Sequence, residues 1–363
     1  MVFAVCAPGL EAVLLGEVQA LGFSATAVPG GVEVPSGDIA TLNRWLRTAS
    51  RVLVRLGEPF RATAFPELVR KASALPWEKF IRPGAPATFR VTCRKSRLYH
   101  SRAVAERLQT ALDARLGTLN GDTRLGHSLG TLDRDTQLFI ARIERDMCTV
   151  SADSSGPLLH QRGYRGPQAK APLRETLAAA LLLSAEWDPA TRLCDPLCGS
   201  GTIAIEAALL AAGRAPGAKR SFSFEKWSAW DVRPFQDRAA PNAGRIEGSD
   251  QDAGAVAAAR ENADRAGVAI ELVQRTLAAV PPDGGPGMIA CNPPYGVRIA
   301  ADVRRVFRDL GDVARRRPGW KVAAIVADSS AMSAAGLRWN RLLRTENGGI
   351  PVDFVVSDPV GKN

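Results

Sequence analysis

RLCDPLCGSGTIAIEAALLAA, residues 192–212, places a short apolar strand, a glycine-rich turn and an apolar helix in immediate succession. We expect the strand at 192–195 and the helix at 202–212, with Gly199 and Gly201 in the turn between them. A further helix is expected just upstream, at 173–186. A strand that runs through such a turn into a helix is the repeating unit of an α/β sheet, so further units of this kind are expected downstream.

Downstream of this turn, strands and helices continue to alternate. The pattern predicts a strand ending at Asp250, a helix at 253–266, strands at 269–273 and 288–291, a helix at 301–315 and a strand at 321–327. Repeated alternation of this kind predicts a parallel, doubly wound sheet that binds ligands at the carboxyl ends of its strands. The chain therefore belongs to the α/β class over its second half.

The first 155 residues have a different, α+β texture. We expect a helix within 6–23, a hairpin at 28–34, a helix at 41–46, strands at 51–56, 87–93, 137–142 and 148–152, and helices at 66–75 and 101–116. The chain has 363 residues, 46% of them apolar, which is enough for two or three domains and excludes general disorder.

Charge and cysteine content narrow the functional classes. The net charge of +10 favours a polyanionic partner, and residues 1–170 carry +8 of it. Arginine greatly outnumbers lysine. This excess would suit the recognition of phosphate groups, but a GC-rich genome is the preferred explanation. The longest apolar runs, at 1–7 and 177–183, are far too short to span a bilayer, and six cysteines without C-x-x-C pairs predict no metal site. We expect a reducing, cytoplasmic setting without a membrane partner.

The turn at 195–201 does not fit a dinucleotide site. Ala204 stands where a third glycine is expected, and the next acidic residue at a strand end, Asp250, is too distant. Asp195 before the glycines suits a cationic ligand better than a pyrophosphate. Asp250 itself could accept the hydroxyls of a ribose or cap the following helix, for which Asp252 is the better candidate.

A second motif, Asn292-Pro293-Pro294-Tyr295-Gly296, directly follows a short apolar strand. The prolines stiffen the turn and remove amide donors, leaving the Asn292 side-chain oxygen and the Pro293 carbonyl as acceptors. Two convergent acceptors can hold both hydrogens of an amino group, and Tyr295 offers an aromatic face to a base. The alternative is an ordinary proline-rich turn with a buried tyrosine.

These motifs, in this order, resemble those of class I S-adenosylmethionine-dependent methyltransferases that act on exocyclic amino groups. Further stretches are similar to the THUMP-containing RNA guanine-N2 methyltransferases of large-subunit ribosomal RNA or tRNA, notably 46–51, 96–101, 159–165, 171–183 and 223–227. The resemblance implies a ferredoxin-like domain at 1–56, a THUMP RNA-binding domain at 57–155, a linker at 156–170 and a Rossmann-like, doubly wound methyltransferase domain at 171–363.

The resemblance also implies roles for individual residues. Asp195, Gly199 and Gly201 would border the methionine part of S-adenosylmethionine, Asp250 would hold its ribose, and Thr176 would line its amino-acid end. Asn292, Pro293, Pro294 and Tyr295 would form the catalytic turn, with Asn292 also facing the cofactor. One departure concerns adenine: Thr276 stands where the family usually has an acidic residue.

RNA contacts are expected at two basic clusters. Arg94, Lys95, Arg97 and Arg102 surround Tyr99 and His100, while Arg162 and Arg165 stand beside His160. Two other features allow two interpretations each. The aromatic residues at 222–230 could flank the target base or pack in the core. Arg315-Arg316-Arg317 could form a solvated helix end or contact RNA. Cys194, Cys198 and Cys291 are expected to be core residues. Competing functions are a tRNA, adenine-N6 or protein glutamine methyltransferase, and a non-catalytic RNA-binding assembly factor; the oligomeric state is open.

Overall fold

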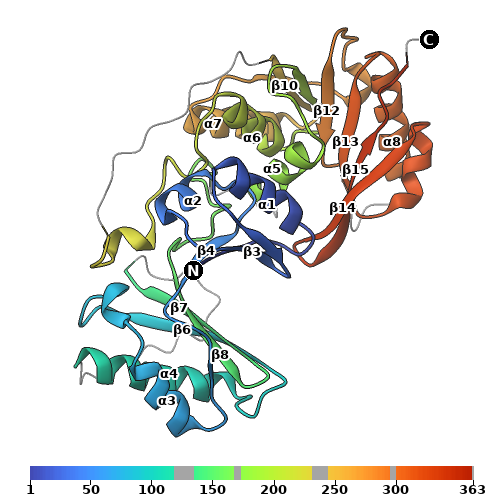
Figure 1. The fold of residues 1–363 in the computed structure, drawn as a ribbon. Coiled ribbons are helices and arrows are strands. Elements are labelled where there is room, and N and C mark those ends of the chain that lie inside the picture. The colour runs from blue at the N-terminus through green and yellow to red at the C-terminus, as the bar shows by residue number, and fades with distance from the viewer. Residues whose placement is uncertain (118–134, 167–172, 231–243, 295–299, 362–363) are drawn as a thin grey trace.

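This computed structural model describes residues 1–117, 135–166, 173–230, 244–294 and 300–361. Over these residues the chain forms two sheets, one of eight strands in the first half and one of seven in the second. Figure 1 shows α1, α2, β3 and β4 against the second sheet in one body, while α3, α4 and β6–β8 form a lobe that projects from it. None of the helices within the described ranges is long and apolar enough to cross a membrane.

The second sheet has the strand order β11-β10-β9-β12-β13-β15-β14. Its first five members run parallel, as the alternating pattern predicted. The bounds are β9 Arg192–Asp195, β10 Ile246–Asp250, β11 Glu271–Gln274, β12 Gly287–Cys291 and β13 Lys321–Val326. The chain order reverses between β9 and β12, and a crevice for ligands opens outside the strand ends at such a switch point.

At its far edge the sheet contains a hairpin that the alternating pattern did not predict. β14 (Trp339–Asn347) and β15 (Ile350–Ser357) form a hairpin, and β15 pairs antiparallel with β13. A tight turn through Gly348 and Gly349, both with positive φ, makes this reversal possible. The sheet is therefore mixed, with its parallel part confined to the half that carries the glycine-rich turn.

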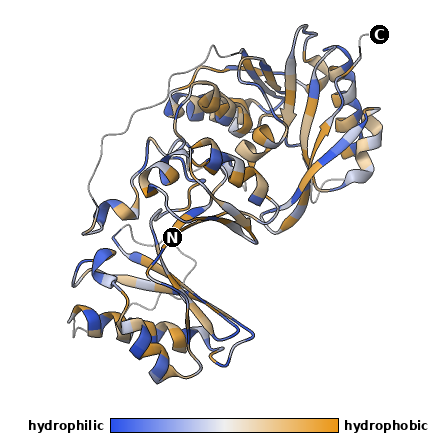
Figure 2. Ribbon diagram, viewed as in Figure 1, coloured by the Kyte–Doolittle hydropathy of each residue, from blue (hydrophilic) through white to orange (hydrophobic). Residues whose placement is uncertain are grey.

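Helices cover both faces of this sheet, with bounds α5 Glu175–Ser184, α6 Thr202–Ala211, α7 Ala253–Ala266 and α8 Ala300–Arg315. α5 and α6 are apolar on nearly every side and almost wholly buried, as their orange colour in Figure 2 indicates. A helix without a polar face has to be covered on all sides. Here α5 and α6 join one continuous core that extends into the N-terminal sheet.

The first sheet has the order β2-β3-β1-β4-β8-β7-β6, and the short β5 also pairs with β8. The bounds are β1 Val2–Val5, α1 Glu11–Ala20, β2 Thr26–Val28, β3 Gly31–Val34, α2 Ile39–Trp45, β4 Arg51–Arg55, β5 Phe60–Arg61, α3 Phe65–Ser73, β6 Ala87–Arg94, α4 Ser101–Leu116, β7 Gln137–Glu144 and β8 Met147–Asp153. The apolar run at 1–7 thus contributes an interior strand.

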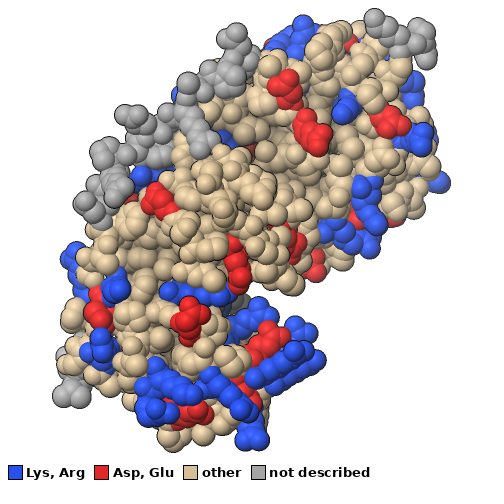
Figure 3. Space-filling model, in the orientation of Figure 1, with Lys and Arg blue, Asp and Glu red and all other residues tan. Residues whose placement is uncertain are grey.

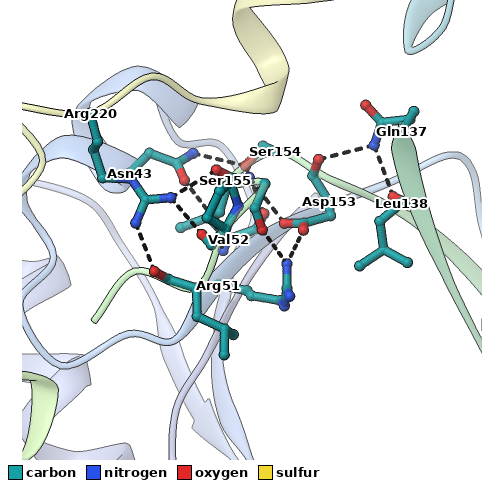
Figure 4. A network of polar contacts seen from close by, with 12 residues as sticks. Asn43, Arg51, Val52, Gln137, Leu138, Asp153, Ser154, Ser155 and Arg220 are labelled. Atoms are coloured by element: carbon teal, nitrogen blue, oxygen red, sulfur yellow. Dashed lines mark hydrogen bonds and ion pairs between the residues drawn. The ribbon is translucent and has the colours of Figure 1, made fainter. Parts of the chain in front are cut away.

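A buried polar network fastens the end of β8 to the N-terminal segment (Figure 4). The Asn43 amide donates to Ser154 Oγ over 2.8 Å, and Ser155 Oγ donates back to Asn43 Oδ1 over 2.6 Å. Arg51 pairs with the fully buried Asp153. Because these groups are buried and satisfied, they fix one arrangement of the segment that leads into the methyltransferase-like half.

Candidate active site

Three neighbouring strands end at one edge of the second sheet and carry polar side chains there. Asp195 is the last residue of β9 and pairs with Gly248 of β10, two residues before Asp250. Asn292 follows β12, which is the neighbour of β9 on its other side. The tertiary structure therefore brings together the two motifs that are separated by almost a hundred residues in the chain.

The glycine-rich turn adopts a conformation that requires glycine. Gly199 and Gly201 have φ values of 50° and 83°, in the left-handed region. A Cβ atom at Gly201 would also stand 3.0 Å from the Ala259 side chain of α7 and 3.3 Å from that of Ile205. These glycines let the backbone turn sharply from β9 into α6 while α7 packs closely against it.

Asp250 anchors this turn from the neighbouring strand. Its Oδ2 accepts a hydrogen bond from Gly199 N over 3.0 Å, and its Oδ1 accepts one from Asp252 N over 3.0 Å. The cap of α7 is Asp252, which accepts from the amides of Gly254 and Ala255. Each carboxylate oxygen of Asp250 can accept a further donor, so the side chain remains able to bind two hydroxyls.

Asp195 is a buried carboxyl with little compensation. It is 1% exposed, and its Oδ1 accepts a hydrogen bond from Leu197 N over 3.2 Å. Burial, and secondarily the charge of Asp250, raises the pKa of Asp195 to about 8. A cationic group placed beside it would replace the lost solvation of the charged form. This is the electrostatic character expected of a site for an amino group.

This raised pKa predicts how folding stability depends on pH. The unfolded chain releases the Asp195 proton near pH 4, whereas the folded chain holds it up to about pH 8. The folded state binds the extra proton in between, so the free energy of unfolding falls as the pH rises through this range. We expect Asp195→Asn to lessen that fall by a few kcal/mol, about 1.4 per pKa unit.

Urea unfolding at pH 5 and pH 8.5 measures this difference. The control is Asp264→Asn, because Asp264 is an exposed residue of α7. Equal pH dependence in wild type and Asp195→Asn would show that the carboxyl is not held neutral in the folded chain.

Asn292 presents an acceptor that nothing in the described chain occupies. Its Oδ1 atom is buried and accepts no hydrogen bond from the described residues. Buried polar atoms almost always have a partner, and an orphan at a strand end points to a ligand. Pro293 is buried and Pro294 half-buried beside it, while Tyr295 lies outside the described residues.

Arg165 joins the start of α5 to the glycine-rich turn. Its guanidinium donates to Glu175 Oε1 over 2.9 Å and to Thr202 Oγ1 over 3.0 Å, and it also contacts the Ser200 hydroxyl at 3.4 Å. Thr176, in the first turn of α5, is buried beside this connection. Arg165 thus positions two predicted cofactor-binding segments relative to each other, in addition to any contact with RNA.

Arg162, expected as an RNA contact, is 3% exposed and lies in the interior. It donates to the carbonyls of Leu159 and Arg47 and pairs with the buried Glu206 at 3.6 Å. Because its donors face protein groups, it cannot reach an RNA phosphate in this arrangement, and that expectation is corrected here. Its function in the fold is to link the N-terminal segment to α6.

Sequence patterns did not reveal one supporting residue, Asn262 of α7. Its amide donates to Ser200 O over 3.0 Å, and its oxygen accepts from Gly166 N over 3.2 Å. It is buried in a helix whose other buried residues are apolar, and a lone asparagine at such a position was the available signal. Asn262 thus holds the glycine-rich turn at Ser200, next to the Gly199 amide that Asp250 binds.

Comparison with known proteins places this site in a family. A family model for the RMKL-like, methyltransferase domain matches residues 162–355, more than half of the chain. The chain belongs to this methyltransferase family. A second model, for an RlmL ferredoxin-like domain, matches residues 1–53. The resemblance to this methyltransferase family and the expected α/β methyltransferase fold are confirmed.

Relatives of this methyltransferase cover nearly the whole chain. A ribosomal RNA large subunit methyltransferase K/L from Syntrophotalea carbinolica is 35% identical over 96% of the chain. The chain spans about half, 52%, of that relative's length. A structure from Listeria monocytogenes str. 4b F2365, described as a predicted N6-adenine-specific DNA methylase, has 32% identity and a TM-score of 0.81, covering 97% of this chain and 95% of its own.

A further solved structure, SMU.472, was determined in complex with SAH. It is 27% identical, has a TM-score of 0.82, and the match covers all of this chain and 98% of the other.

The aromatic cluster at 222–230 belongs to the core of this methyltransferase. Phe222, Phe224 and Trp227 are nearly fully buried, and the Phe222 and Phe224 rings stack 5.4 Å apart. Trp227 packs edge-on against Phe80 of the other lobe. The base-flanking interpretation is therefore wrong for these three side chains.

The three cysteines near the site are core residues, as expected: Cys194, Cys198 and Cys291 are buried, and burial raises the pKa of each thiol.

The first basic cluster lies on the surface of the projecting lobe. The side chains of Arg94, Lys95, Arg97 and Arg102 are exposed around the end of β6 and the start of α4. Tyr99 is 68% exposed, with its ring 4.0 Å from that of His100. Figure 3 shows lysine and arginine gathered over this lobe, whereas the face above it is sparsely charged. An exposed aromatic ring among cations suits stacking on an unpaired base.

No group of metal-binding side chains occurs within the described ranges.

Arg317 does not lie at a solvated helix end. It is buried, pairs with Glu247 of β10 and donates to Pro281 O. The side chain closes the sheet at the edge opposite the candidate site.

Proposed function

We propose that this chain transfers a methyl group from S-adenosylmethionine to the exocyclic N2 amino group of a guanine in large-subunit ribosomal RNA. The observation that carries the proposal is the buried Oδ1 of Asn292, which follows β12 and has no hydrogen-bond partner among the described residues; β12 lies next to the strand that ends in Asp195. An acceptor so placed suits the N–H of an amino group, and it sits at the ligand-binding edge of the sheet.

The cofactor is S-adenosylmethionine, as expected from the motifs. The chain belongs to a methyltransferase family, and a full-length structural relative was solved with SAH, which is what remains of S-adenosylmethionine after methyl transfer. The chain's residues fit this cofactor: the buried Asp195 carboxyl suits its amino group, and Asp250 retains acceptors for ribose hydroxyls. When bound, the cofactor supplies an electrophilic methyl group.

In this proposal the chain's own residues position and orient the reactants. Asn292 Oδ1 and the Pro293 carbonyl accept the two hydrogens of the target amino group, which directs its nitrogen lone pair towards the methyl donor. The diproline turn keeps these two acceptors rigid. No strongly basic side chain is required, because the nitrogen becomes acidic as it gains the methyl group. The rate then comes from orientation and charge placement.

Asp250→Ala is expected to weaken S-adenosylmethionine binding by about ten- to a hundredfold, because hydrogen bonds to a charged group contribute about 1.5–3 kcal/mol. Calorimetry with the cofactor measures this affinity, and Asp264→Ala, at an exposed position of α7, is the control. Asp250→Asn, which keeps one acceptor oxygen, should fall between them. An Asp250→Ala variant with wild-type affinity would remove the ribose contact from the proposal.

RNA is proposed as the substrate on two grounds. The relative described as a ribosomal RNA methyltransferase names that substrate, and the projecting lobe carries the exposed cluster of Arg94, Lys95, Arg97 and Arg102. We assign residues 57–155 as a THUMP domain, 156–170 as the linker and 171–363 as the methyltransferase domain. A cytoplasmic site of action is part of the same proposal.

Mass-spectrometric nucleoside analysis tests the proposal. Ribosomal RNA and tRNA are fractionated from a deletion strain and from strains complemented with wild type or Asn292→Ala. N2-methylguanosine missing from the large-subunit RNA and restored by wild type alone supports the proposal. Loss of N2-methylguanosine from tRNA instead would make tRNA, and not ribosomal RNA, the substrate. Loss of N6-methyladenine from DNA, the activity named for the Listeria relative, would replace the proposal.

A further inference from the structure

A large cavity lies beside the candidate active site, formed by segments 157–166, 173–175 and 218–226 together with Asp135. Its volume is about 1120 Å³. Pockets for small ligands usually measure about 300–1,000 Å³, so this cavity is slightly larger than most of them. We call it the basic cavity, because its lining includes Arg165, Arg174, Lys219, Arg220 and Lys226.

Two of these cations are available to a ligand. The Arg174 side chain is exposed, and its guanidinium makes no hydrogen bond or ion pair with the described residues. Lys219 is exposed and donates to Arg265 O over 2.5 Å, which leaves other ammonium hydrogens for a second partner. Arg220, by contrast, is committed to main-chain carbonyls, among them Ser155 O at 3.1 Å (Figure 4). Arg174 and Lys219 thus supply cationic donors from two different segments of the lining.

The acidic groups of the cavity are already paired. Glu175 accepts from Arg165, and Asp135 is bound by Lys226. The excess positive charge acts on His160, whose pKa is lowered to about 4, first by burial and then by Arg174, Arg162, Arg165 and Arg220. A cavity with this surplus attracts an anion.

Arg165 connects the basic cavity to the catalytic edge, since it lines the cavity and contacts Ser200 and Thr202 of the glycine-rich turn. The S-adenosylmethionine site, with its buried Asp195, has the opposite preference and suits a cation. A polyanion in the cavity and an amino group at Asp195 can therefore be bound side by side without competing for the same charge.

We propose that the basic cavity binds the sugar–phosphate backbone of the RNA beside the nucleotide being methylated, with Arg174 and Lys219 on its phosphates. The inference rests on the proposed function, because it takes RNA as the substrate. It assigns the second contact region: the projecting lobe holds the RNA at a distance, and this cavity leads one strand to the edge where Asn292 lies.

The test compares two double variants that lose the same charge. The cavity variant, Arg174→Gln with Lys219→Gln, removes two cations from the lining of the basic cavity. The control variant, Arg341→Gln with Lys321→Gln, removes two exposed cations that do not line it. The probe is a fluorescein-labelled oligouridylate, titrated between 50 and roughly 200 mM salt. We expect the cavity variant to bind roughly tenfold more weakly at about 0.1 M salt, with a salt slope smaller by about 1.4. The control should match wild type.

Three outcomes would overturn the assignment. Equal loss in both double variants would make the effect one of net charge. A lower S-adenosylmethionine affinity of the cavity variant with RNA binding intact would place Arg174 on the cofactor instead. A shift of the His160 resonance with inorganic phosphate but not with the oligouridylate would make the cavity a site for small anions. RNA binding is measured separately from methyl transfer. The binding result therefore still tests the cavity if the methylated base is not the guanine N2 proposed above.

Discussion

Asn292→Ala is expected to lower the rate of methyl transfer by at least 10²–10³-fold, the usual cost of removing one preorganised hydrogen-bonding group from an active site. The reason is that its Oδ1 is a buried acceptor without a partner among the described residues, so a ligand group has to complete it. Alanine removes the oxygen and leaves the diproline turn in place. The affinity for S-adenosylmethionine should stay nearly unchanged, because Asp195 and Asp250, the side chains proposed to hold its amino group and ribose, lie on β9 and β10.

Single-turnover transfer from radiolabelled S-adenosylmethionine to the RNA measures the rate, and calorimetry measures cofactor affinity. Asn340→Ala is the matched control, since Asn340 is an exposed asparagine on β14 that bonds to Asp358. A fully active Asn292→Ala would end the role proposed for the side chain. A variant that loses cofactor affinity and rate together would instead place Asn292 on the cofactor.

Arg162→Ala is expected to destabilise the fold by about 3–5 kcal/mol, the cost of leaving one member of a buried ion pair alone. Glu206, whose side chain is inaccessible to solvent, would keep the Tyr164 hydroxyl as its hydrogen-bond donor and lose its cation. The change would also break the bond to Arg47 O, which ties the N-terminal segment to the methyltransferase half. Denaturant unfolding at neutral pH measures the effect.

A double-mutant cycle separates the pair from its surroundings. Arg162→Met with Glu206→Gln removes both charges, so the double variant should recover part of the stability lost by Arg162→Met alone. RNA affinity of the folded variants should remain that of wild type, because Arg162 is buried. If Arg162→Met weakened RNA binding at unchanged stability, the residue would be a direct RNA contact after all.

Local sequence determined most elements of this protein. α4 and α7 occur at the predicted residues, each closed by a glycine with positive φ, Gly117 and Gly267. The parallel direction of β9–β13 followed from the alternation of strands with helices, whereas their order in the sheet was decided by the tertiary structure. The motifs at 195–201 and 292–295 could be assigned to one ligand-binding edge because parallel strands all end on the same side of the sheet.

The partner of each charged side chain was decided by the tertiary structure. Arg162 and Arg165 are three residues apart in one basic stretch, yet one is buried against Glu206 and the other joins Glu175 to the glycine-rich turn. Arg317 ends a run of three arginines and is buried against Glu247. A guanidinium looks alike in every local pattern, and only packing between distant segments determines whether it meets a carboxylate or solvent. For the same reason, the cavity of Arg174 and Lys219 became visible only in the folded chain.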